Sequence, residues 1–478
     1  MRNKYTTLWI WLFLCPLALD YKSAEASSGH AAQFLLAALS IGSGLILVLI
    51  SPRFGRSSAL RSIVTAALLL TVLGSFITQL LQGNDFGNYL RVLLPFVLFL
   101  LGYLVACHPW RKERLKHFEQ AMFWAMVMSM AFSFVYGMAI STDLETVRFR
   151  IVSVTLLGLQ GVLLHEMVVA RHVTKFTMML FLCTVVIELL SVTRSLIVGT
   201  LLLCMLAVWM SGYSARHLLR AVVRSVVIIA ALGGVAVSAA AIYPEVAEHW
   251  TQRVFASKET TSGRDPTTIT RLAEMKDQYD QVVSSPTSLL AGKGFGHFYH
   301  YSPDYLPYLA GQLSRKDFYA IKEWAAGHNF WVYQFFAGGL IFGIGLPVAV
   351  LYALYCGVAA FRSWRRIRPD APYLPIMGRS ILLLAALLAT SIGGNPLGPR
   401  FSGLVFGVAL GLLVSMYSRL SLSIKRQPVK RSRRRPVVVA PALTPTPTPA
   451  LTLTPRPSPR LSHAKHSAEG DDHLMPSA

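Results

Sequence analysis

Long apolar runs, separated by short polar connections, occupy most of the chain. A helix needs about 20 predominantly apolar residues to cross a bilayer, and twelve runs approach or exceed that length. They span residues 6–19, 31–51, 60–81, 89–107, 118–140, 151–170, 176–192, 195–211, 221–243, 329–360, 374–392 and 401–418. Backbone polar groups in lipid must be hydrogen-bonded within their own segment, so we expect helices. The pattern predicts an all-α polytopic membrane protein with about twelve transmembrane helices.

The composition agrees with this interpretation. Of the 478 residues, 54% are hydrophobic and 14% are charged, whereas about a quarter of the residues in a soluble domain are charged. So few charges could not cover a water-facing surface, which excludes a soluble globular enzyme, a disordered protein and a fibrous one. The formal net charge of +22 first reports orientation in a membrane protein and does not indicate nucleic-acid binding.

Basic residues fall at every second connection between the apolar runs. These connections carry Arg53, Arg56 and Arg61; Arg111, Lys112, Arg114 and Lys116; Arg171 and Lys175; Arg216, Arg220 and Arg224; and Arg362, Arg365, Arg366 and Arg368. The positive-inside rule places them, and both termini, in the cytoplasm. The chain then divides into N-terminal membrane helices (1–243), one large external loop between the ninth and tenth helices (244–328), C-terminal membrane helices (329–418) and a tail (419–478).

The two ends of the chain differ in character. The first apolar run is followed by Ala24-Glu25-Ala26, which resembles a signal cleavage site. We favour an uncleaved helix, because polar residues at 20–22 separate the run from that site; cleavage would leave eleven spans. The tail combines a basic cluster with a Pro/Thr-rich repeat at 441–459. That composition cannot bury a core and predicts a disordered cytoplasmic tail.

The cysteines, the external carboxylates and one His-Glu pair do not have the spacing of a metal or catalytic site. The five cysteines lie within or beside apolar runs without a CxxC pair, so we expect packing residues and no metal centre. The external carboxylates Asp265, Glu274 and Asp277 are too scattered to indicate a site, and no cofactor is expected. His165 and Glu166, toward the inner end of the sixth run, are interpreted as structural.

The external loop contains its own helix signal. Loops as long as residues 244–328 are uncommon and often functional. Apolar residues recur at helical spacing after Thr270, which predicts a helix with Thr270 as N-cap and Pro286 beyond its end. The glycine-rich residues 292–296 lack the spacing of a phosphate-binding loop. They predict a bend that lets the backbone pack closely, in preference to a ligand contact.

Two polar residues stand out at the predicted outer face. His328 precedes Asn329, which can cap a helix that enters the membrane. Neutral His is a good general base near pH 7, although a hydrogen-bonded interfacial His explains the spacing equally well. Arg194 lies between the seventh and eighth runs. It is either functional or a structural interfacial residue held by Glu188.

Further arginines join Arg194 on the outer side in this topology. Arg148, Arg150, Arg264 and Arg271 all fall in external connections, against the positive-inside trend. Guanidinium forks match phosphate oxygens in paired hydrogen bonds. The distribution therefore predicts an electropositive outer pocket that suits an anionic substrate such as a diphosphate.

Three stretches within about residues 180–345 carry a family resemblance. They are Ser191-Val192-Thr193-Arg194-Ser195, the segment from Arg271 to the Gly-x-Gly turn at 292–296, and His328-Asn329 ahead of Gly338-Gly339-Leu340, Gly343 and Gly345. In this order they resemble the Ser/Thr–Arg turn, the arginine-led outer helix and the HN…GxxG signature of the O-antigen ligase and O-antigen polymerase superfamily. The family helix carries a Trp where this chain has Met275, and Arg264 competes with Arg271 for the loop position.

The resemblance implies a glycosyltransferase of the bacterial inner membrane whose active site faces the periplasm. It would transfer a glycan from a polyprenyl-diphosphate donor to a hydroxyl of a lipid-linked acceptor, lipid A–core, with inversion and without a metal. Arg194 with Arg271 or Arg264 would bind the diphosphate, and His328 would accept the hydroxyl proton. The partners would be the donor, the glycolipid acceptor and membrane lipids, with no nucleic acid.

Alternative functions stay open. A polymerase that extends a repeat-unit chain shares the fold and the motifs, as does a protein O-oligosaccharyltransferase. A transporter or flippase of a lipid-linked anionic solute is the alternative from another class. Transporters often consist of two related halves, and this sequence shows no such repeat and a single one-sided loop, which favours the enzyme.

Overall fold

The computed structural model describes residues 2–20, 30–54, 57–140, 151–191, 193–212, 263, 265–309, 313–392 and 394–426, with scattered residues between 216 and 255. All named elements in these ranges are helices, and one isolated β-bridge there pairs Tyr299 with Glu323. The prediction of an all-α protein is therefore confirmed for the described part of the chain.

The helices follow the predicted apolar runs. In chain order they are α1 (Arg2–Leu14) with the turn η1 (Cys15–Leu19), α2 (His30–Ile50), α3 (Ala59–Gln82), α4 (Phe86–Ala106), α5 (Lys112–Ile140), α7 (Ser153–Leu164) with η2 (His165–Val169), α8 (Lys175–Leu190), α9 (Arg194–Ser211), α12 (Pro266–Val283), α13 (Pro286–Ala291), η4 (Pro303–Tyr305), α14 (Leu306–Leu309), α15 (Arg315–Ala320), α16 (Phe330–Gly338) with η5 (Gly339–Gly343), α17 (Gly345–Ile367), α18 (Leu374–Ala389) with η6 (Thr390–Ile392), and α19 (Ser402–Arg426).

The lengths of these helices support a membrane protein. Six of the described helices, α3, α4, α5, α9, α17 and α19, are long and apolar enough to cross a bilayer. Five shorter apolar helical segments accompany them. The total of about twelve spans stays a prediction, because the predicted run 221–243 lies largely outside the described residues.

The predicted run 329–360 is not one continuous helix. It divides into α16, the π-helical η5 and α17. Gly339, at the break, has a φ of 59°, in the left-handed region that favours glycine. A Cβ atom on Gly339 would lie 2.6 Å from the backbone nitrogen of Gly292. The break is therefore the place where the glycine-rich bend at residues 292–296 packs against the apolar helices.

The glycine-rich residues 292–296 form the predicted bend. Three of them are glycines with φ between 74° and 86°. The amides of Lys293 and Gly294 donate to the carbonyl oxygens of Phe336 and Ala337, at 2.8 and 3.0 Å. These bonds attach the bend to the C-terminal end of α16, so the interpretation as a close-packing bend is confirmed.

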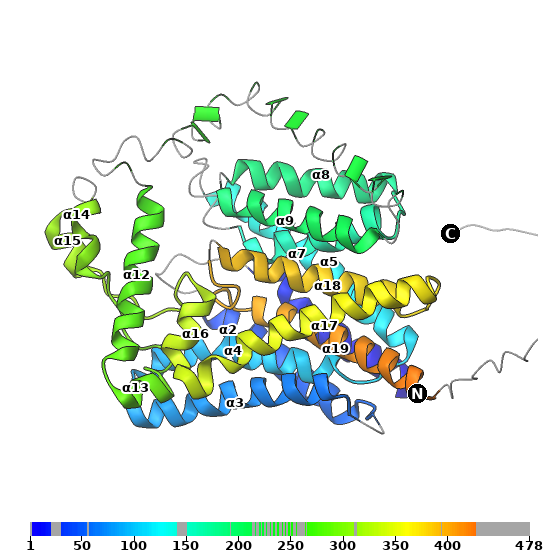
Figure 1. Ribbon diagram of the computed structural model, residues 1–478, viewed down its shortest axis with the longest axis horizontal. Helices are drawn as coiled ribbons and strands as arrows, with labels where there is room; N and C mark the ends of the chain where they lie inside the picture. The colour runs from blue at the N-terminus through cyan, green and yellow to red at the C-terminus, as the bar shows by residue number, and fades with distance from the viewer. Residues whose placement is uncertain are drawn as a thin grey trace, which may run out of the picture. The chain divides into compact units, whose positions relative to one another are not determined.

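The core forms where α18 and α19 pass among the other helices (Figure 1). Helix α19 packs along α4, and α18 contacts both α7 and α19. A Cβ atom on Gly407 would collide with the carbonyl oxygen of Phe99, and the rings of Phe99 and Phe406 stack with centroids 4.6 Å apart. Small residues allow this close approach, as they do between membrane helices in general.

Contacts between connections sort the helix ends into two groups. At one end, Arg61 contacts His108, Arg365 donates to the carbonyl oxygens of Val169 and Met210, and Arg419 lies over the ring of Tyr373. The predicted basic connections thus lie near one another. At the other end, Asn84 donates to the carbonyl oxygen of Lys293 at 2.8 Å. This grouping agrees with the charge alternation, and the side that each end faces stays a prediction.

Candidate functional site

Helix α12, which lies beside α16 (Figure 1), organises the candidate site. It begins after Asp265, whose Oδ2 accepts a hydrogen bond from the amide of Thr268 at 3.0 Å, with Pro266 in the first position. The prediction of Thr270 as N-cap is therefore wrong. An Asp-Pro pair is the stronger start signal, because Asp accepts from an exposed amide and Pro has no amide to satisfy. The predicted end of the helix before Pro286 is confirmed.

Arg194 is the first residue of α9, and its partner is the N-cap residue of α12. Its Nη2 donates to Oδ1 of Asp265 at 2.8 Å. The predicted pairing of Arg194 with Glu188 is wrong: Glu188 is 3% exposed and accepts from Gln160 and Thr200 inside the bundle. Burial raises the pKa of Asp265, but hydrogen bonds from Thr268 and Arg194 and the Arg194 charge lower it more, so the pKa lies below its usual range. Asp265 is therefore ionised at neutral pH.

His328 is held by a carboxylate from the same helix. Its Nδ1 lies 2.7 Å from Oε2 of Glu274, and its backbone amide donates to Oε1 of Glu274 at 2.8 Å. The Glu274 side chain is 3% exposed, whereas that of His328 is 58% exposed. Gln278 also donates to Oε1 of Glu274, at 3.2 Å. A buried carboxylate thus fixes an imidazole whose larger part stays accessible.

Gly327 makes this contact possible. A Cβ atom on Gly327 would lie 2.5 Å from both Oε1 of Glu274 and Nε2 of Gln278. A side chain there would displace the Glu274 carboxylate and the Gln278 amide from their places beside the backbone of His328. The predicted cap by Asn329 is confirmed next to it, since its side chain accepts from the amides of Trp331 and Val332, both at 3.0 Å. Residues 327–329 therefore both start α16 and attach it to α12.

Sequence reasoning missed Glu274, which it set aside among scattered external carboxylates. The signal that could have found it is its position on α12. Arg271, Glu274 and Gln278 lie three and four residues apart, which places them on one face of a helix. That face is the one that meets His328.

Arg271 lies one turn before Glu274 and close to the same group. It is half-buried. Its charge acts on Tyr301: burial and the charges of Glu274 and Glu323 raise the pKa of that phenol, and the nearby Arg271 guanidinium opposes the rise. Arg271 therefore lies within electrostatic reach of Tyr301, on which the Glu274 charge also acts. The other predicted arginines, Arg148, Arg150 and Arg264, lie outside the described residues.

The arrangement of Glu274 and His328 has a chemical consequence. An ionised carboxylate can only accept hydrogen bonds, so the contact with Nδ1 is completed by a proton on that nitrogen. In the neutral imidazole, Nε2 is then the acceptor nitrogen of the ring. A base oriented by a third group in this way is the arrangement found beside activated nucleophiles. The site can accept a proton from a hydroxyl that reaches Nε2.

Within the described part of the chain, no group of three or more His, Cys, Asp or Glu is arranged to hold a metal ion. No family model matches the sequence, and no curated protein matches it significantly.

His297, which follows the glycine-rich bend, should make the stability of the fold depend on pH. Nδ1 of His297 lies 2.7 Å from Oδ1 of Asn84. Burial, followed by the Lys293 charge, lowers the pKa of His297, against a smaller opposing effect of Asp277. The unfolded chain therefore binds this proton at higher pH than the folded one. Stability contributed here is complete above about pH 6.5, the ordinary His value, and is lost as pH falls below it.

A His297→Gln variant tests this dependence. Its thermal midpoint should fall less than that of the wild type between pH 7 and pH 5, because glutamine can keep a hydrogen bond to Asn84 without titrating. Thermal unfolding of both proteins in one detergent across that range gives the comparison. Identical pH profiles would show that His297 does not contribute.

Proposed function

We propose that the chain is a membrane glycosyltransferase of the O-antigen ligase type, which transfers a glycan from a polyprenyl diphosphate to a hydroxyl of a lipid-linked acceptor such as lipid A–core. The observation that carries this proposal is the exposed His328 ring held by the buried Glu274 carboxylate. Arg271 lies one turn away on the same helix, and the helix cap binds Arg194. Helix α12 thus connects a base with two cations.

The reaction would be a direct displacement at the anomeric carbon. The acceptor oxygen forms a bond to the anomeric carbon while the bond from that carbon to the diphosphate oxygen breaks. The electron pair of the broken bond leaves with the diphosphate. The hydroxyl proton moves to Nε2 of His328. Attack opposite the leaving group inverts the anomeric centre. The donor brings its own activated leaving group, so the reaction needs no nucleotide and, in this proposal, no metal.

The arginines would receive the charge that develops on the leaving group. Among the described contacts, Arg194 uses only Nη2 for Asp265, which leaves other donors of its five N–H groups. The pair with Asp265 orients the guanidinium before substrate binds. Arg271, or Arg264 just before the helix cap, would supply the second cation.

A polymerase of the same superfamily would use the same groups with a growing glycan as acceptor or donor, and a transporter would bind an anionic headgroup without needing a base. The Glu274–His328 pair favours the enzyme over the transporter. A strain that lacks the chain tests both. Core lipid without long glycans, together with polymer on the polyprenyl carrier, would support the ligase. Surface chains of single repeat units would favour the polymerase, and normal surface glycans would contradict both enzymes.

The proposal places α12 on the periplasmic side of the inner membrane and the tail in the cytoplasm. A cysteine at Thr287, an exposed position at the start of α13, should react with an impermeant maleimide in intact spheroplasts. A cysteine at Ser467, in the predicted tail, should react only after permeabilisation. The natural cysteines must first be replaced, since Cys15 and Cys183 are exposed. If only the cysteine at Ser467 reacted in intact spheroplasts, the proposed orientation in the membrane would be wrong.

A further inference from the structure

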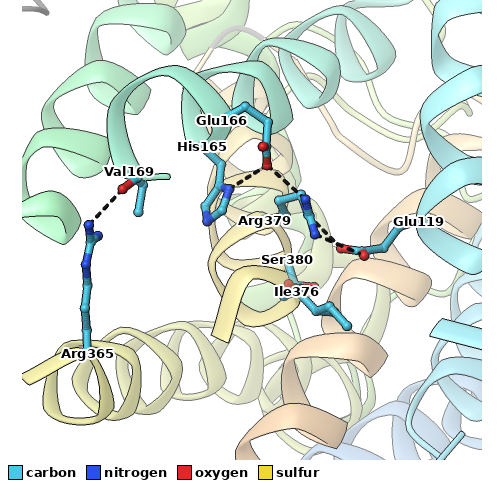
Figure 2. Close-up of polar contacts among 8 residues, drawn as sticks. All are labelled: Glu119, His165, Glu166, Val169, Arg365, Ile376, Arg379 and Ser380. Atoms are coloured by element: carbon cyan, nitrogen blue, oxygen red, sulfur yellow. Dashed lines mark hydrogen bonds and ion pairs between the residues drawn. The ribbon is translucent and has the colours of Figure 1, made fainter. Parts of the chain in front are cut away.

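A second charged cluster lies between α5, η2 and α18 (Figure 2). The Arg379 guanidinium forms a paired contact with Glu119, from Nε to Oε1 at 2.8 Å and from Nη2 to Oε2 at 3.2 Å. Its Nη1 donates to Oε1 of Glu166 at 2.9 Å. Nδ1 of His165 lies 3.0 Å from the same oxygen. Two carboxylates therefore share one arginine, and no described residue donates to Oε2 of Glu166.

Stability alone does not account for this cluster. Arg379, Glu119 and Glu166 are partly buried, and such ion pairs add little net stability, because the cost of desolvation offsets much of the attraction. His165 and Glu166 also begin a π-helical turn that runs to Val169. Such turns are rare in proteins, and those that occur are often at functional sites. Arg365 fixes the end of the turn by donating to the carbonyl oxygen of Val169 at 2.8 Å (Figure 2). A structural role, as predicted for His165 and Glu166, therefore does not fully explain this cluster.

The cluster forms one wall of a cavity of about 280 Å³. Pockets that bind small ligands are typically apolar with a few placed polar groups, and this cavity has that character. Its apolar walls include Met126, Val162, Leu163, Leu383 and Leu412. Lys116 and Gln120, which are exposed, also line it. The cavity thus has an apolar interior, a carboxylate-rich wall and a cation at its exposed side.

We propose that this cavity binds a zwitterionic phospholipid with a primary ammonium group, of the phosphoethanolamine class. The ammonium would donate to the unpartnered Oε2 of Glu166, since carboxylates outnumber the arginine in the cluster. Lys116 would meet the phosphate, and an acyl chain would fill the apolar walls. A choline headgroup has no N–H to donate, and a glycerol headgroup has no cation. The site therefore distinguishes lipids by headgroup, independently of the proposed enzyme activity.

Thermal unfolding of the purified full chain in detergent tests the binding. Short-chain lipids with identical acyl chains and ethanolamine, choline or glycerol headgroups are titrated in turn. The ethanolamine lipid should raise the midpoint at concentrations about tenfold lower than the other two. Equal shifts with all three lipids, or no shift with any, would overturn the proposal.

Variants locate the site. Lys116→Ala and Glu166→Gln should each weaken the ethanolamine response by about tenfold, and Val162→Phe, which fills the cavity, should remove the response to every lipid. Lys112→Ala is the matched control, because it removes an exposed charge from the same helix outside the cavity. If Glu166→Gln does not fold, the exposed Lys116→Ala variant decides. Wild-type headgroup selectivity in Lys116→Ala and Val162→Phe would contradict the assignment.

Discussion

Replacing His328 by alanine should lower donor turnover by about 100-fold or more, the usual contribution of a general base. The side chain is 58% exposed, so its removal leaves no cavity in the core and the protein should fold normally. The measurement is single-turnover transfer by purified protein reconstituted in lipid with saturating acceptor. The thermal midpoint of the variant serves as the folding control. Turnover equal to that of the wild type would show that His328 is not the general base.

Glu274→Gln distinguishes orientation of the base from simple packing. The carboxylate accepts from both the amide and Nδ1 of His328, whereas a glutamine has one oxygen and can accept only one of them. If that oxygen keeps the amide, the NH2 group faces Nδ1 and favours the tautomer that cannot act as base at Nε2. Losing a charge-assisted bond worth about 1.5–3 kcal/mol should lower kcat by roughly 10- to 100-fold, with little change in the KM for donor. An unchanged kcat would show that Glu274 only packs.

The sequence predicted the helices because apolar runs of membrane length have one solution for their backbone bonds. The runs around α3 and α4 were placed within a few residues, and the start of α19 was placed within one residue, although that helix continues to Arg426, past the predicted end at Ser418. The break at Gly338-Gly339 was not predicted, because both halves of that run are apolar and only the contact with Gly292 shows why the helix stops. A break caused by a segment 47 residues earlier in the chain has no local signal.

The candidate site was predicted in part. His328 was found from its place before a capping Asn329, a local signal. The partner of Arg194 was assigned wrongly, because Glu188 is near in sequence but points into the bundle, where Gln160 and Thr200 bind it. The true partner, Asp265, lies 71 residues away. Pairings over such distances depend on how helices pack, which spacing alone does not encode.

Arg194→Lys and Arg271→Lys should both be impaired in donor use by roughly 10- to 100-fold. Lysine keeps the positive charge but loses the planar fork that makes paired bonds to phosphate oxygens. Each charge-assisted bond is worth about 1.5–3 kcal/mol, and about 1.4 kcal/mol corresponds to a tenfold change in rate. The measurement is turnover of the polyprenyl-diphosphate donor in lipid-reconstituted protein at saturating acceptor.

Arg264→Lys is the comparison that tests which loop arginine is used. Arg264 immediately precedes Asp265, the partner of Arg194 and the cap of α12, whereas Arg271 lies one turn from Glu274. If Arg271 binds the diphosphate, Arg264→Lys should retain most of the activity, because Arg271, near His328, then stabilises the leaving group. An inactive Arg264→Lys with an active Arg271→Lys would assign the role to the arginine beside the cap and overturn the motif alignment in the loop. Normal activity in all three lysine variants would reject arginine binding of the diphosphate altogether, and His328 would then be a base without an identified leaving-group site.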